Sequence, residues 1–145
     1  MFWKIGYMKP IFYEKSVVFT NGCFDILHRG HIEMLRHCRL RGDVVIVGID
    51  ADERVRRNKG SIRPINCAQD RKVILESLRF VDRVEIFEDE EELADLVERY
   101  SPDLMIVGED YKNKKVIGAE YARELEFFPK VREYSTTQIL RGCQS

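Results

Sequence analysis

Short runs of apolar residues alternate along this chain with segments whose apolar residues recur every three or four positions. The first run is VVFT at 17–20, and Ile32, Leu35 and Cys38 follow it at helical spacing. The second run, VVIVGI at 44–49, is continuously apolar, which is typical of a strand that is covered on both faces. The pattern therefore predicts strands that pair in parallel, each followed by a helix.

The same alternation continues through the rest of the chain. Further strands are predicted at 84–87, at 104–108 and near 124–128. One helix is predicted to begin near Asp52, and the next passes through Val73, Leu75 and Leu78. A further helix is predicted for DEEELADLVERY, a short one begins near Gly118, and the last one follows Ser135. Five strands that alternate with helices in this way predict an α/β fold with one doubly wound parallel sheet.

Length and charge narrow the classes of protein to consider. A chain of 145 residues, 44% of them hydrophobic, can bury one sizeable core, so we expect a single domain. Its 24 lysine and arginine residues nearly balance 25 aspartate and glutamate residues, which gives a net charge of -1. No general basic field would draw such a protein to nucleic acid or to anionic lipid. Any anion site must then be a local arrangement.

The start of the chain and its cysteines indicate where the protein works. The aromatic residues near the start are interrupted by Lys4, Lys9 and Pro10, so this segment lacks the core of a signal peptide. No stretch approaches the length of a membrane span. The four cysteines contain no CxxC pair, which suits free thiols in a reducing compartment. We therefore expect a cytoplasmic protein that does not bind membranes.

The segment NGCFDILHRGH at 21–31 joins the first predicted strand to its helix. Ligands of doubly wound sheets bind beyond the carboxyl ends of the strands, and a helix N-terminus next to glycine can hold a phosphate closely. Gly22 and Gly30 would permit that approach. His28 and His31 are three residues apart, so both imidazoles can donate N–H groups to one anion. We interpret the pair as an anion site rather than as two exposed histidines at a helix start.

Zinc binding is a competing interpretation of the same segment. Asp25, His28 and His31 could supply three ligands. In the familiar helical zinc motif, however, the two histidines are four residues apart and a glutamate lies between them. Zinc catalysis is therefore the weaker hypothesis.

Two segments together carry a resemblance to a known family. NGCFDILHRGH, with its HxGH core, resembles the signature of the cytidylyltransferase-like nucleotidyltransferases, and STTQIL at 135–140 resembles their second signature. Within the family, the chain is most similar to the adenylyltransferase domain of the bifunctional heptose enzyme. Two further regions carry that similarity. One is the segment NKGSIRPIN together with residues 69–71, and the other is the segment GEDY together with Gly118, which follows it. The resemblance implies a Rossmann-like nucleotidyltransferase fold, with an N-terminal extension at 1–15 and the nucleotidyltransferase domain at 16–145.

The resemblance implies a reaction and its participants. In the heptose enzyme, D-glycero-D-manno-heptose 1-phosphate attacks the α-phosphorus of ATP, ADP-heptose forms and pyrophosphate leaves. The family resemblance implies Mg²⁺ as cofactor and a homodimer, and a separate sugar kinase would have to supply the sugar phosphate. The alternative within the family is a glycerol-3-phosphate cytidylyltransferase using CTP, whose pattern shares HxGH, STT and the RFVD segment at 79–82. The alternative from another class is a nucleotide-binding sensor without turnover.

The resemblance also implies roles for individual residues. His28, His31, Lys59 and Arg71 are the expected catalytic residues, and Asp25 is expected to support the metal ion unless it only caps a turn. The nucleotide-binding residues implied by the resemblance are Thr20, Asn21, Gly22, Cys23, Phe24, Gly30, Asp110, Tyr111, Lys130, Ser135, Thr136 and Thr137. Solvated surface charge is the alternative for Arg71 and Lys130, whereas capping of a helix by Ser135, Thr136 and Thr137 is compatible with phosphate binding.

The chain departs from the heptose pattern at two places. Glu109 stands where the heptose enzymes tend to have a second glycine, and 133–134 replaces a turn that contains glycine. We expect any difference in base or sugar preference to arise there.

Overall fold

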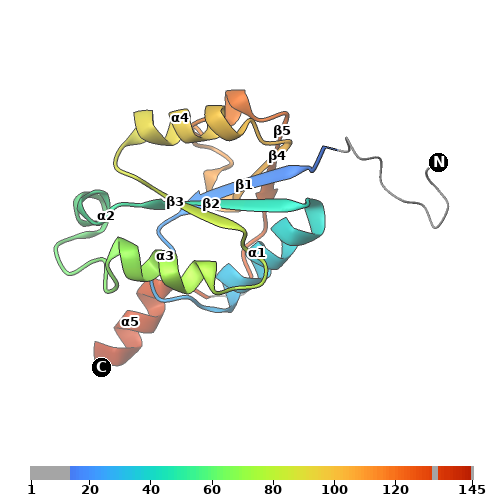
Figure 1. Cartoon of the computed structure of the whole chain (residues 1–145). Coiled ribbons are helices and arrows are strands. Elements are labelled where there is room, and N and C mark those ends of the chain that lie inside the picture. The colour runs from blue at the N-terminus through green and yellow to red at the C-terminus, as the bar shows by residue number, and fades with distance from the viewer. Residues whose placement is uncertain (1–13, 132–133, 145) are drawn as a thin grey trace.

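The computed structural model describes residues 14–131 and 134–144, and these form one α/β domain around a parallel sheet (Figure 1). Within this part of the chain the sheet has five strands in the order β3-β2-β1-β4-β5. The strands are β1 (Val17–Gly22), β2 (Val44–Asp50), β3 (Arg83–Phe87), β4 (Leu104–Gly108) and β5 (Glu124–Phe128). The chain adds β2 and β3 on one side of β1 and then crosses to the other side for β4 and β5. The prediction of a doubly wound parallel sheet is confirmed.

The helices lie close to their predicted positions. They are α1 (Arg29–Arg41), α2 (Asp52–Lys59), α3 (Ala68–Glu76), α4 (Glu90–Tyr100) and α5 (Thr136–Gln144), with short 3₁₀ turns η1 (Glu109–Tyr111) and η2 (Ala119–Tyr121). The short helix predicted from Gly118 is thus a single 3₁₀ turn. None of the helices in the described ranges is long and apolar enough to cross a membrane.

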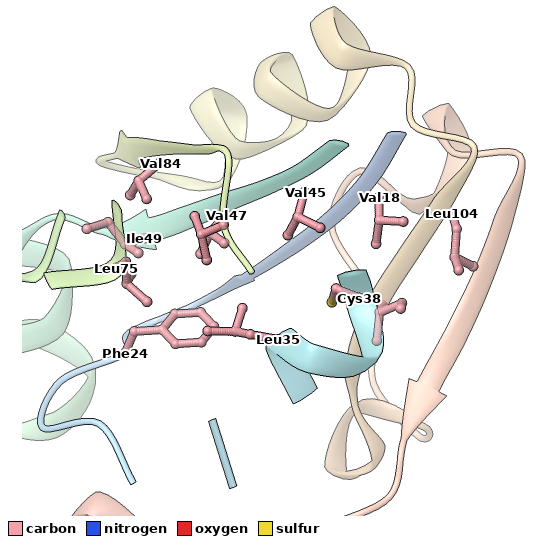
Figure 2. Packing of buried hydrophobic residues seen from close by; sticks show 12 residues of the cluster. Val18, Phe24, Leu35, Cys38, Val45, Val47, Ile49, Leu75, Val84 and Leu104 are labelled. Atoms are coloured by element: carbon pink, nitrogen blue, oxygen red, sulfur yellow. The ribbon is translucent and has the colours of Figure 1, made fainter. Parts of the chain in front are cut away.

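Two apolar clusters pack on the two faces of the sheet, because successive residues of a strand point to opposite sides. On one face, Val45 and Val47 of β2 pack with Leu35 of α1 and Leu75 of α3 (Figure 2). On the other face, α4 lies over the sheet (Figure 1), and its buried side chains belong to the second cluster. Both faces of β1, β2 and β4 are therefore buried, as their continuous apolar runs predicted.

Aspartates fasten the strands at their amino ends. Each of three aspartates lies directly before a strand and accepts a backbone N–H at the start of the neighbouring strand, with N···O distances of 2.8 to 3.0 Å. The pairs are Asp43 with Ser16, Asp82 with Val45, and Asp103 with Val17. Polar contacts thereby join neighbouring strands at their amino ends. The pocket described below lies at the other end of the sheet, beyond the carboxyl ends of the strands.

The predicted N-terminal extension lies almost entirely outside the described residues. Its aromatic residues all belong to 1–13. The division at residue 15 stays a prediction.

Candidate active site

A pocket of about 520 Å³ lies beyond the carboxyl ends of β1, β4 and β5. The strand order reverses between β1 and β4, which is where ligands bind in doubly wound sheets. Its walls come from the β1–α1 loop, the end of β4, the segment after β5 and the start of α5. The lining residues among those predicted from the sequence are His28, Gly30, His31, Lys59, Asp110, Lys130, Ser135, Thr136 and Thr137.

The two histidines form a reciprocal cap at the start of α1. The Nδ1 atom of His28 accepts the Gly30 backbone N–H at 3.1 Å, and the Nδ1 atom of His31 accepts the His28 backbone N–H at 3.2 Å. A nitrogen that accepts an N–H carries no proton, so each neutral ring carries its proton on Nε2. The helix start therefore selects one tautomer for both imidazoles and leaves two Nε2–H donors for a ligand.

Stacking and burial keep the two imidazoles uncharged. Their ring centroids are 3.8 Å apart, with an angle of 25° between the planes. Burial lowers the pKa of His31 to about 3, and the neighbouring His28 and Lys59 act on it in the same direction. Burial also lowers the pKa of His28. At neutral pH the pair acts as two uncharged hydrogen-bond donors and not as a pair of acids.

The loop before α1 is held in an unusual backbone conformation. Phe24 and Ile26 have φ angles of 55° and 49°, in the left-handed region that residues with a side chain rarely adopt. A Cβ atom at Gly30 would lie 2.9 Å from the His28 ring, so only glycine lets that ring fold back over the helix start. Strained backbone therefore precedes the two histidines in the chain, and a close approach at Gly30 lies between them.

Asp25 holds a neighbouring loop through its carboxylate. Its side chain is buried, and its carboxylate oxygens accept the backbone N–H groups of Ile65 at 2.6 Å and Asn66 at 3.0 Å. Among the described residues, no group of three or more histidine, cysteine, aspartate or glutamate side chains could hold a metal ion. The carboxylate thus anchors the loop before α3, in agreement with the alternative of a turn cap, and its support of a metal ion stays a prediction.

Arg71 is buried and lies outside the lining of the pocket. It is only 1% exposed, so solvated surface charge does not describe it, and its role in binding phosphate stays a prediction. Its guanidinium donates to the backbone oxygens of Asn66 and Cys23 and to the Asp52 carboxylate, at 2.8 to 2.9 Å. Arg71 therefore ties α2, α3 and the β1–α1 loop together from behind the pocket.

The C-terminal helix closes the pocket over the same loop. The Thr136 hydroxyl donates to the backbone oxygen of Asp25 at 2.6 Å, and the Ser135 hydroxyl accepts the Gln138 N–H at 3.0 Å. Ser135 thus caps α5 as predicted, while Thr136 joins the two sequence signatures in space. Thr137 lies exposed in the pocket wall.

The cations of the pocket come from three elements. Lys59 is the last residue of α2, and Gly60 follows it with a φ angle of 105°. Lys130 lies on the exposed segment after β5. Arg63, which the sequence analysis did not single out, also lines the pocket although its side chain is only 7% exposed. The available signal was its place in the RPIN segment that follows Lys59.

The other predicted nucleotide-binding residues lie outside the lining of this pocket. The side-chain oxygens of Thr20 and Asn21 are buried without a hydrogen-bond partner in the described structure. Burial raises the pKa of the Cys23 thiol, which keeps it uncharged at neutral pH. Gly22 and Phe24 support the loop from the side of the core, and Tyr111 lies exposed on η1. A role of these residues in nucleotide binding stays a prediction.

The geometry can be compared with known proteins. The family model described as "Cytidylyltransferase-like" matches residues 19–141, which include both signatures and nearly all of the sheet. The chain belongs to the cytidylyltransferase-like family. The family predicted from the two signatures is thus confirmed, and with it the class of enzyme, a nucleotidyltransferase.

Curated relatives in the cytidylyltransferase-like family include longer proteins. Proteins named "Bifunctional protein HldE" are 46% identical over 131 residues in a Nitratiruptor species and 45% identical over 128 residues in Campylobacter concisus (strain 13826). These matches cover 90% and 88% of this chain but only 28% and 27% of the relatives. The chain therefore spans about a quarter of the length of the curated relatives it matches.

A solved structure supports the same assignment. The lipopolysaccharide core biosynthesis protein from Thermoplasma volcanium GSS1 superposes with a TM-score of 0.66 and 28% sequence identity. The match covers 81% of this chain and 99% of that one. A domain of this size thus also occurs as the whole chain of a solved structure.

Proposed function

We propose that this domain transfers AMP from ATP to a sugar 1-phosphate, with D-glycero-D-manno-heptose 1-phosphate as the first candidate, and releases pyrophosphate. The observation that carries the proposal is the pair of Nε2–H donors on His28 and His31, set beside Lys59 and the start of α5 in one pocket. The sugar is chosen from the resemblance to the heptose enzyme and from the relatives named HldE.

The chemistry requires little of the protein beyond alignment and positive charge. A phosphate monoester has its second pKa near 6, so the acceptor is already anionic at neutral pH and needs no general base. One of its oxygens attacks the α-phosphorus in line, the bond to the bridging oxygen breaks, and pyrophosphate leaves with that oxygen. No covalent intermediate with the protein is needed.

The two imidazoles are suited to the charge that builds up on the α-phosphoryl oxygens. Because the Nδ1 atoms are held by backbone N–H groups, the Nε2–H donors are oriented before the substrate binds. Loss of one oriented donor of this kind costs about a hundredfold to a thousandfold in rate. Lys59 and Lys130, which both line the pocket, would bind phosphate oxygens.

We also propose a divalent cation, Mg²⁺, as a companion of the nucleotide. Mg²⁺ keeps several waters and is commonly held by phosphate oxygens with few protein ligands, so it does not need the carboxylate of Asp25. A cytoplasmic homodimer and a separate sugar kinase remain parts of the proposal that follow from the family resemblance.

A pyrophosphate-release assay tests the reaction. ATP and CTP are each combined with heptose 1-phosphate and with glycerol 3-phosphate, in the presence of Mg²⁺. We expect ATP with heptose 1-phosphate to give the highest turnover. Preference for CTP with glycerol 3-phosphate would establish the alternative within the family, and nucleotide binding without pyrophosphate release would establish the sensor.

Variants of the histidines test the mechanism. His28→Ala and His31→Ala should each lower turnover about a hundredfold or more. His37→Gln is the matched control, because His37 lies on α1 outside the pocket and contacts Glu126 of β5. Turnover that survives both alanine substitutions would contradict the proposed site.

A further inference from the structure

Arg63 is buried in the wall of the pocket with an unused hydrogen-bond donor. Its side chain is 7% exposed, and its Nε atom has no hydrogen-bond partner among the described residues. A buried donor without a partner costs free energy, and such groups are rare in native proteins. Among the described residues, the contacts of Arg63 thus leave hydrogen-bonding capacity of its guanidinium unused.

Asp25 balances the charge of Arg63 without using this donor. The Asp25 Oδ2 atom lies 3.6 Å from Arg63 Nε, which is too far for a hydrogen bond. Both Asp25 oxygens already accept backbone N–H groups, from Ile65 and Asn66. The carboxylate thus makes it less costly to hold a cation in a buried position, but it does not occupy the Nε–H.

A second pocket of about 380 Å³ lies next to the first, and Arg63 lines both. The two pockets share Lys59, Arg63 and Thr137. The remaining lining of the second pocket is Ile62, Leu140 and Arg141. Three of its six lining residues are cations and none is acidic, so the space favours an anion. The pair of pockets is large enough for a ligand that extends from the histidines toward α5.

We propose that Arg63 is a further phosphate-binding residue, whose guanidinium binds a phosphate oxygen of a polyphosphate ligand where the two pockets meet. This inference rests on the proposed function, in which a nucleoside triphosphate enters and pyrophosphate leaves. A guanidinium suits this place because its donors lie in one plane and match phosphate oxygens, and because it stays charged when buried. The anchored carboxylate of Asp25 keeps the guanidinium facing the ligand.

Binding of inorganic pyrophosphate to the full chain, measured by titration calorimetry, tests the proposal. Hydrogen bonds to charged groups are worth about 1.5–3 kcal/mol, so Arg63→Gln should bind pyrophosphate about tenfold to a hundredfold more weakly than the wild type. Arg63→Lys keeps the charge beside Asp25 but lacks the planar donors, so it should also bind more weakly. The matched control is Arg39→Gln, which removes an arginine that pairs with a carboxylate, Asp82, outside both pockets.

The outcomes separate this inference from the proposed reaction. Thermal unfolding without ligand shows which Arg63 variants are folded, and unchanged pyrophosphate affinity in any folded variant overturns the role of Arg63. A wild-type chain that binds no pyrophosphate overturns it too. Turnover with ATP and heptose 1-phosphate is measured separately, so the reaction can stand while the role of Arg63 fails. Equally, weaker pyrophosphate binding by the variants supports Arg63 whichever sugar phosphate proves to be the acceptor.

Discussion

Protonation of His31 should make the folded protein sensitive to mild acid. The pKa of His31 lies near 3 in the folded protein, against an ordinary value of 6.5. As the pH falls below 6.5, the unfolded chain takes up this proton first, so acid favours unfolding. The stability associated with the neutral imidazole is present above pH 6.5 and is lost progressively as the pH falls toward 3.

The size of the effect follows from the two pKa values. Between pH 6.5 and 3, each unit of pH removes up to about 1.4 kcal/mol of the free energy of unfolding. At about pH 5 the loss from this one group is about 2 kcal/mol relative to about pH 7.5. For a domain of 145 residues that corresponds to a fall in Tm of about 4–8 °C. The lowered pKa of His28 adds a loss of the same sign.

Thermal unfolding at about pH 7.5 and about pH 5 measures this loss. Other groups titrate over the same range, so the fall in Tm is compared with that of His31→Gln. Glutamine at this helix position can still accept the backbone N–H of the capping residue, but it does not titrate. We expect the wild type to lose about 2 kcal/mol more than the variant between the two pH values. Equal losses would refute the burial of a neutral His31 and, with it, the proposed pair of neutral donors.

Three further substitutions test the contacts behind the pocket. Arg71→Met should lower the free energy of unfolding by about 3–5 kcal/mol in urea titrations, because the buried backbone oxygens that Arg71 binds lose their donor. A loss below about 1 kcal/mol would contradict the structural role of Arg71. Asp25→Asn should cost about 1–3 kcal/mol, since an amide cannot accept both backbone N–H groups of the loop. The Mg²⁺ concentration for half-maximal turnover should stay within about twofold in that variant, and a rise of about tenfold would show that Asp25 supports the metal ion. Thr136→Val removes the hydrogen bond to the Asp25 backbone oxygen, so the free energy of unfolding in the same urea titrations should fall by about 1 kcal/mol. The KM for ATP should rise as well. Unchanged stability and KM would show that this contact does not hold α5.

The order and direction of the strands could be predicted because they depend on local patterns. Continuous apolar runs such as 44–49 and 104–108 mark strands that are buried on both faces, and the helical spacing between them leaves little choice of topology. The histidine pair was found for a similar reason. Both of its members and the glycine between them lie within one helical turn, so their geometry follows from the sequence spacing.

The roles of the two buried arginines could not be predicted in the same way. Arg71 binds backbone oxygens, one of them from Cys23, 48 residues earlier in the chain, and a backbone oxygen leaves no trace in residue type. Arg63 stands in a loop whose position depends on the buried carboxylate of Asp25. From sequence alone, an arginine that holds the scaffold together and one that lines the pocket look the same. Only packing of distant segments distinguishes them.

The bond between Thr136 and the backbone of Asp25 joins residues separated by 111 positions. A polypeptide emerging from the ribosome can therefore place its imidazoles well before the wall formed by α5 exists, whereas β5, the last strand of the sheet, is made shortly before α5. Acquisition of ligand affinity then becomes one of the last events in the maturation of the chain. Loss of the C-terminal residues through a premature stop codon would leave a folded sheet with an open, unproductive pocket.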